Sequence, residues 1–287
     1  MTLRLPTAGR PDGTQSVQRA AAVLRTLASH NRAGLRVVDL CEMTGLKRPT
    51  VHRLLQCLAR ERLVVRNART RNYHLGPMLY ELGLTAAPAV KLDALCRPHL
   101  RALADATGDM AFLTLRSGFD AVCIDRQEGE FWIRTYTLDV GTRRPLGIGA
   151  GSLAILAALD DRERSEVLAV NRERYPAYND ASALQLGRMA KQTQRRGFAI
   201  HDGSVSGARA IGIPVYDASG APIAGVSVSA IMSRMEEKRW PELVRRLREC
   251  ADAIQRGLKA SAATVPLTAK NRGAPRSRLR TTKSKST

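Results

Sequence analysis

The stretch that decides the fold runs from Arg36 to Gly76 and reads RVVDLCEMTGLKRPTVHRLLQCLARERLVVRNARTRNYHLG. Its first part predicts a short helix, which Gly45 can end because glycine readily adopts the left-handed backbone conformation. A second helix is predicted from Pro49 to Glu61, since its apolar residues recur at spacings of three and four. These apolar residues are Val51, Leu54, Leu55 and Leu58. Two short helices joined by a tight turn are typical of a helix-turn-helix unit.

The beginning of the second helix carries the polar side chains that favour DNA binding. A recognition helix presents this end to base edges and phosphates in the major groove. The polar residues there are Lys47, Arg48, Thr50, His52 and Arg53. We therefore expect these five residues to contact double-stranded DNA.

Two short strands are predicted behind this helix, at Leu63 to Arg66 and at Asn72 to Leu75. The hairpin tip between them carries Arg69 and Arg71, which suits it to backbone or minor-groove contact. A small helical core with a solvated basic face is the alternative interpretation. The succession of helix, glycine turn, basic helix and basic hairpin favours a winged helix-turn-helix that binds DNA.

Charge is spread unevenly along the 287 residues, whose formal net charge is +20. Basic residues exceed acidic residues most strongly at the two ends, while the middle is nearly balanced. We infer that the ends meet a polyanion and that the middle has another task. A hydrophobic content of 44% in a chain of this length is enough for two domains with their own cores.

Composition also argues against membrane and metal-dependent classes. No run approaches the roughly 18 apolar residues of a membrane span, and the N-terminus lacks the apolar centre of a signal peptide. We expect a cytoplasmic protein with no membrane partner. The five cysteines stand singly in apolar surroundings, which predicts buried free thiols. Cys96 and His99 have a ligand-like spacing but no second pair, so we expect neither a metal nor another cofactor.

The rest of the chain divides by composition and by hydrophobic period. Residues 90–258 predict an α+β domain in which helices pack on a six-stranded sheet, and the first three of its strands are expected to form an antiparallel meander. Those strands are Met110 to Arg116, Ala121 to Arg126 and Trp132 to Thr137; the later ones are Phe198 to His201, Arg209 to Tyr216 and Ile223 to Ser229. The predicted division is 1–15 flexible N-terminus, 16–76 DNA-binding domain, 77–89 linker helix, 90–258 second domain and 259–287 disordered basic tail.

The order of these parts resembles the IclR family of transcriptional regulators over roughly residues 16–258. Three stretches carry the likeness: GLKRPTVHRLL at 45–55, VGTRRPLGIGAGSLAILAAL at 140–159 and RRGFAIHDGSVSGARAIGIPVYDASGAPIAGVSVSA at 195–230. The resemblance implies a winged helix-turn-helix joined by a linker helix to an effector-binding domain of GAF-like fold. It also implies a repressor or activator that works as a homodimer or homotetramer.

The resemblance further implies where an effector binds in the second domain. The contacts fall at the start of a helix, at the Asp after a Gly-aromatic strand, and on two later strands. In this sequence the positions are Ala150, Gly151, Ser152, Asp202, Ala210, Ser227 and Ser229. The sequence departs from many members beside that helix start, where Gly147, Gly149, Ser152 and Leu153 replace His, Thr or Ser, Gly and Lys.

Physical chemistry supports part of this effector site. A glycine-rich turn that opens a helix leaves backbone amides free to bind a carboxylate. Ser227 and Ser229 lie two apart on one strand, so their hydroxyls point to the same side. The residues therefore predict a small organic acid as the effector. In the alternative interpretation, the glycines only permit close packing and the serines face solvent.

Enzymatic functions fit the sequence less well. GIGAGS at 147–152 partly resembles a dinucleotide fingerprint, but Ser152 replaces its third glycine. Gly203 to Gly207 has Val205 where a nucleophile elbow needs Ser. His201 and Asp202 are adjacent, so on a strand they point to opposite faces and cannot form a catalytic pair. We expect no catalytic residues. The remaining alternative is an architectural DNA-binding protein that needs no ligand, which small organic acids would leave unaffected.

Overall fold

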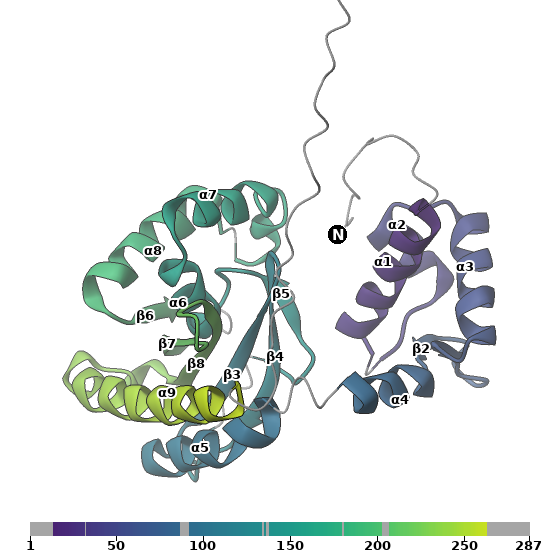
Figure 1. Cartoon of the computed structure of the whole chain (residues 1–287). Coiled ribbons are helices and arrows are strands. Elements are labelled where there is room, and N and C mark those ends of the chain that lie inside the picture. The colour runs from purple at the N-terminus through teal and green to yellow at the C-terminus, as the bar shows by residue number, and fades with distance from the viewer. Residues whose placement is uncertain are drawn as a thin grey trace, which may run out of the picture.

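The computed structural model describes residues 14–86 and 92–262, apart from 32, 134, 136, 137, 180 and 203–206. The described residues form an N-terminal helical unit and a C-terminal α+β unit (Figure 1). Within these ranges no helix combines the length and the apolar character needed to cross a membrane. The predicted flexible N-terminus, 1–15, and basic tail, 259–287, lie mostly outside the described ranges; of their described residues, Gln15 begins the first helix and 259–262 belong to the last helix.

The N-terminal unit has the elements of a winged helix-turn-helix. In chain order they are α1 (Gln15–Ser29), α2 (Val37–Thr44), α3 (Arg48–Arg60), β1 (Val64–Arg66), β2 (Tyr73–Leu75) and α4 (Pro77–Ala86). Gly45 ends α2 with a φ angle of 70°, and its N–H donates to the carbonyl of Cys41 at 2.9 Å. The two strands pair antiparallel. On the predicted apolar stripe of α3, Val51 and Leu55 are fully buried in the core of this unit and Leu58 is buried with them, while Leu54 is half-buried against that core.

The C-terminal unit is built on an antiparallel sheet whose strand order is β5-β4-β3-β8-β7-β6. The strands are β3 (Met110–Ser117), β4 (Asp120–Gln127), β5 (Arg143–Pro145), β6 (Ala199–Asp202), β7 (Ala208–Tyr216) and β8 (Pro222–Ile231). Strands from the two halves of the domain meet at the centre, where β3 pairs with β8. The α+β class, a six-stranded sheet and five of the six predicted strands are confirmed within the described residues.

The third predicted strand, Trp132 to Thr137, is wrong. Of this stretch, Trp132, Ile133 and Thr135 are described, and none lies in a strand. The edge position is taken by the short strand β5 instead. The chain leaves the sheet because the N–H of Phe131 donates to the carbonyl of Gly108 at 2.9 Å, and the Phe131 ring packs against Arg234 at 4.0 Å.

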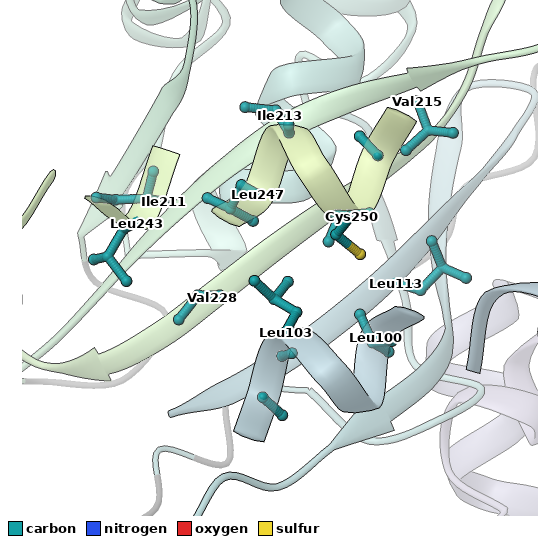
Figure 2. Close-up of a cluster of buried hydrophobic side chains, with 14 of the residues drawn as sticks. Leu100, Leu103, Leu113, Ile211, Ile213, Val215, Val228, Leu243, Leu247 and Cys250 are labelled. Carbon is teal, nitrogen blue, oxygen red and sulfur yellow. The ribbon is translucent and has the colours of Figure 1, made fainter. Parts of the chain in front are cut away.

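Helices cover both faces of the sheet. On one face lie α5 (Leu92–Thr107) and α9 (Trp240–Ala262), which close the larger core with side chains from β3, β7 and β8 (Figure 2). On the other lie α6 (Ala150–Ala158), α7 (Asp161–Val170) and α8 (Ala183–Arg196), which form a second core. Successive residues of a strand face opposite sides, so each strand contributes alternately to both layers.

The start of α6 lies directly on the sheet, and glycines permit this approach. A Cβ added to Gly225 on β8 would lie 2.2 Å from the carbonyl oxygen of Gly151. A Cβ added to Gly212 on β7 would lie 2.7 Å from the carbonyl carbon of Ala150. Backbone at these distances leaves no room for a side chain. The glycines therefore fix the first turn of α6 against the centre of the sheet.

Candidate functional site

The α3 helix separates buried apolar residues from exposed polar ones. Four of the polar residues at its start are exposed and Thr50 is half-buried; the exposed ones are Lys47, Arg48, His52 and Arg53. The ion pairs described in this unit join Arg36 to Asp39 and Arg62 to Glu81. Among the described residues, none engages the cations at the start of α3. Their charges therefore face solvent and are available to a polyanion.

The hairpin tip is held in one shape by Asn67. Its side-chain oxygen accepts from the N–H groups of Arg69 at 2.9 Å and Thr70 at 3.0 Å. Arg71 has a positive φ of 61°, a left-handed backbone conformation at the turn that leads into β2. Arg69 and Arg71 are both exposed. The two arginines predicted to bind DNA are therefore exposed on a short hairpin whose turn is fixed by hydrogen bonds.

A cavity of about 20 Å³ lies between the sheet and the start of α6. It brings together six of the seven predicted effector-binding residues, namely Ala150, Gly151, Ser152, Ala210, Ser227 and Ser229. The other lining residues were missed in the sequence analysis: Phe112, Thr114, Leu138, Ile148, Gly149, His201, Ala208 and Arg209. The period-2 alternation of the predicted strands could have identified Phe112 and Thr114 as sharing a face. Leu138 could not be predicted on the lining in this way, because the strand predicted just before it, at Trp132 to Thr137, is wrong.

The first turn of α6 offers backbone donors to the cavity. Gly149 is the residue before the helix, and Leu153 is the first whose N–H bonds back, to the carbonyl of Gly149 at 2.8 Å. Within the described part of the chain, the N–H groups of Ala150, Gly151 and Ser152 have no hydrogen-bond acceptor. Free first-turn amides and the positive end of the helix dipole both attract an anion.

Buried hydroxyl groups surround these amides. Thr114 and Ser227 are 4% and 5% exposed, and neither side chain has a hydrogen-bond partner among the described residues. A Cβ added to Gly151 would lie 3.3 Å from the Thr114 hydroxyl oxygen and 3.4 Å from that of Ser227. Both hydroxyls therefore adjoin the first turn of α6. Because both residues line the cavity, their hydroxyls can donate to a ligand or a water inside it.

The other two serines are already engaged. The N–H of Gly147 donates to the Ser152 hydroxyl oxygen at 2.8 Å, and the Thr135 hydroxyl donates to that of Ser229 at 3.0 Å. Ser152 thereby holds the turn before α6, and Ser229 holds the segment after β4. Ser227 and Thr114 remain the hydroxyls free for a ligand.

Asp202 does not reach the cavity, which corrects its predicted role. On β6 and β7, His201 lies opposite Ala210 and Asp202 lies opposite Arg209. Both oxygens of the Asp202 carboxylate accept from Arg209, at 2.6 and 2.7 Å, and the Arg209 guanidinium packs over the Trp240 ring at 5.8 Å. The hydrogen bonds from Arg209 lower the pKa of Asp202. Strand alternation therefore turns Asp202 to the α9 face and His201 to the α6 face.

His201 is the titratable side chain that faces the cavity. Its pKa is lowered to about 4, mainly by burial and in addition by the positive charge of Arg144, while Asp202 acts in the opposite sense. The imidazole is therefore neutral at pH 7. Burial also lowers the pKa of Arg144. No carboxylate side chain is present among the described lining residues.

The described residues offer no evident metal site. They contain no group of three His, Cys, Asp or Glu side chains placed to hold an ion. Cys96, considered with His99 for its spacing, is buried in the core beside α9. Cys57 is exposed on α3, contrary to the expectation that all five thiols are buried.

Comparison with known proteins assigns both units. The model of the IclR helix-turn-helix domain matches residues 16–68, and that of the bacterial transcriptional regulator IclR C-terminal domain matches residues 85–256. The transcriptional regulator BhcR of Paracoccus denitrificans is 28% identical over 250 residues, which cover 86% of this chain and 88% of BhcR.

Solved structures agree with this assignment. An IclR regulator from Alicyclobacillus acidocaldarius is 25% identical with a TM-score of 0.68, covering 84% of this chain and 98% of that one. An IclR homologue from Microbacterium hydrocarbonoxydans, solved in complex with 4-hydroxybenzoate, shares the fold with a TM-score of 0.66 and 22% identity, covering 86% of this chain and all of the other. With the two domain models matched in sequence order, this chain belongs to the IclR family of bacterial transcriptional regulators.

Proposed function

We propose that this regulator reads DNA with α3 and the hairpin tip, as a homodimer or homotetramer in the cytoplasm, and that a small carboxylate effector sets its DNA affinity. The observation that carries the DNA contacts is the cluster of exposed cations at the start of α3, for which the described residues provide no ion pair. Unpaired cations gain most from phosphate contacts because they surrender no existing partner.

Direct base readout is proposed for Arg48 and Arg53, with Lys47, Thr50 and His52 beside them. Arginine suits guanine edges because its planar guanidinium donates two parallel hydrogen bonds. Arg69 and Arg71 at the hairpin tip contact the backbone or the minor groove. One such unit covers one half-site, and a two-fold assembly reads two half-sites ~34 to 36 Å apart or a multiple of that spacing.

The proposed effector binds in the cavity at the start of α6. The free amides of Ala150, Gly151 and Ser152 and the hydroxyls of Thr114 and Ser227 can all donate hydrogen bonds, and together they favour a carboxylate. The 4-hydroxybenzoate bound by the Microbacterium homologue is a small organic acid, which is consistent with an acid as effector here. The acid bound by that homologue supports a ligand-controlled regulator over the architectural alternative.

Binding such an acid requires the cavity to widen. Its volume of about 20 Å³ is close to what one water needs, roughly 10 to 15 Å³. An effector therefore selects or creates a more open arrangement and acts on DNA only if it binds one arrangement better than another. Coupling between two sites is typically worth ~1 to 3 kcal/mol.

The DNA contacts are tested by Arg53→Ala. We expect a loss of ~1 to 3 kcal/mol in operator affinity and a relaxed preference at one base position, because a base-reading arginine is removed. Fluorescence anisotropy with a selected operator and with single-base variants measures both. Arg60→Ala, at the other end of the same helix, is the matched control and should keep the base preference. If Arg53→Ala binds with unchanged affinity and selectivity, α3 does not read DNA as proposed.

A further inference from the structure

The cavity lacks the one acidic side chain that the sequence predicted on its lining. An acid, Asp202, was expected to face the ligand, but the neutral His201 takes that position. The Asp202 carboxylate is on the other side of the sheet, bound by Arg209 through two hydrogen bonds. No described lining residue carries a negative charge.

The charged group that acts on His201 most strongly is a cation. Arg144 on β5 is half-buried, and its positive charge acts on the imidazole. The first turn of α6, which lines the cavity, adds the positive end of a helix dipole. The Arg144 charge and the helix dipole therefore both favour electron-rich atoms in the ligand.

We propose that His201 selects the second polar group of the effector, an inference that rests on the proposed function. The ligand is then a carboxylic acid that also bears a hydroxyl or carbonyl oxygen. Acids that bear an ammonium group instead bind weakly. A neutral imidazole has one donor and one acceptor nitrogen, so it can pair with a hydroxyl or donate to a carbonyl. The carboxylate occupies the amides of α6, and His201 reads the oxygen at the other end.

Rejection of the ammonium group follows from desolvation. An ammonium has three donors and no acceptor, and the described lining offers no carboxylate to pair with it. Burial of an unpaired charge is far more costly than burial of a hydroxyl that finds one partner. The Arg144 charge adds repulsion. An aspartate at position 201 would reverse this order by supplying the missing anion.

The experiment uses matched series in which only one group changes. The first series is propionate, lactate and alanine; the second is 4-methylbenzoate, 4-(hydroxymethyl)benzoate and 4-(aminomethyl)benzoate. Thermal shift followed by calorimetric titration of the full chain measures each affinity. We expect the hydroxy acid to bind tightest within at least one series, and its ammonium counterpart to bind roughly tenfold or more weakly, a factor that corresponds to about 1.4 kcal/mol.

Two variants and one control give the test its specificity. His201→Asp should reverse the order of affinity, so that the ammonium member binds more tightly than the hydroxy member. His201→Ala should lower the affinity for the hydroxy acid to nearly that for the unsubstituted acid. Asp202→Asn changes the adjacent residue on the opposite face, so it should keep the wild-type order. If His201→Asp does not fold, His201→Ala and the wild-type series still decide the assignment.

The outcomes separate this inference from the function on which it rests. If no carboxylate in either series binds, the carboxylate effector and the role of His201 both fail. If the acids bind but the ammonium member is equal to or tighter than the hydroxy member, the carboxylate effector stands and the role of His201 is overturned. A wild-type order that is retained in His201→Ala also overturns it, because the selection then comes from another group.

Discussion

At the scale of single residues, Ser227 and Ser229 differ although they share one strand and one face. The Ser229 hydroxyl is held by Thr135 at 3.0 Å, whereas Ser227 has no partner among the described residues and adjoins Gly151. Their spacing predicts that both hydroxyls point the same way. It does not predict which of them is free, because that depends on a segment 94 residues away in sequence.

The Ser227→Ala variant should therefore weaken effector binding more than Ser229→Ala does. Loss of a hydrogen bond to a charged ligand costs ~1.5 to 3 kcal/mol, and operator affinity without effector should stay nearly constant. Ser229→Ala should mainly lower the melting temperature, since it leaves Thr135 without its acceptor. Calorimetric titration and thermal denaturation of both variants measure these effects. Equal losses of effector and operator affinity in Ser227→Ala would make Ser227 structural.

His201 makes stability depend on pH. Its folded pKa of about 4 lies below the unfolded value of roughly 6.5, so the unfolded chain binds more protons between these values. Stability is therefore lost as the pH falls from about 6.5 to about 4, by at most ~1.4 kcal/mol per pH unit. Asp202, whose pKa is lowered by Arg209, stabilises above its unfolded pKa and changes little over this window.

Urea denaturation at pH 7 and pH 5 tests this linkage. Wild type should lose more stability on acidification than His201→Asn, which has no group that titrates at position 201. Asp202→Asn is the control and should follow the wild type. Identical losses in wild type and His201→Asn would show that the imidazole is not held neutral by burial.

At the scale of elements, the start of α6 depends on the glycines beneath it. The Gly225 and Gly212 positions leave backbone of α6 in contact with backbone of the sheet. This contact sets the place of the free amides relative to Ser227 and Thr114. The first turn of α6 and the two central strands thus act as one element, although they are far apart in sequence.

Gly225→Ala should destabilise the C-terminal unit by ~1 to 3 kcal/mol, because an inserted methyl group forces α6 away from the sheet. Effector binding should fall with it, since the amides move from the hydroxyls. Gly187→Ala on α8 is the matched control: its Cβ would lie 3.4 Å from Leu168, and alanine favours a helix. Chemical denaturation and effector titration compare the two. A Gly225→Ala protein as stable as Gly187→Ala would contradict the contact.

Local patterns in the sequence predicted the elements that local physics determines. The αL end of α2 at Gly45, the apolar stripe of α3 and the order of strands and helices follow from residue type and spacing. The edge strand could not be predicted in this way. The aromatic and β-branched residues from Trp132 on favour a strand locally, but Phe131 just before them contacts Gly108 and Arg234, which are distant in sequence. The side of the sheet on which Asp202 lies likewise could not be predicted, because it depends on the register between β6 and β7.

At the scale of the whole molecule, α4 presents apolar side chains without a partner in the described residues. Tyr80, Leu82 and Leu84 are 71%, 55% and 57% exposed, while Met78 and Leu79 are half-buried. Three large apolar side chains on ten residues of helix favour association. This surface supports the proposed homodimer or homotetramer.

Sedimentation velocity should therefore report an even-numbered assembly at micromolar concentration. Leu82→Glu with Leu84→Glu should shift it toward monomer and weaken operator binding, because two half-sites are then no longer read together. Val170→Glu, at another exposed apolar position, is the control and should leave both unchanged. A wild-type chain that sediments as a monomer both free and on DNA would contradict the proposal.

The small volume of the cavity has a consequence for the time course of regulation. With about 20 Å³ available, the cavity is too small for an organic acid, so binding must wait for the cavity to widen. The observed association rate should then level off at high effector concentration, at the rate of opening. A regulator of this kind responds to sustained exposure to its effector and does not respond to brief increases in effector concentration.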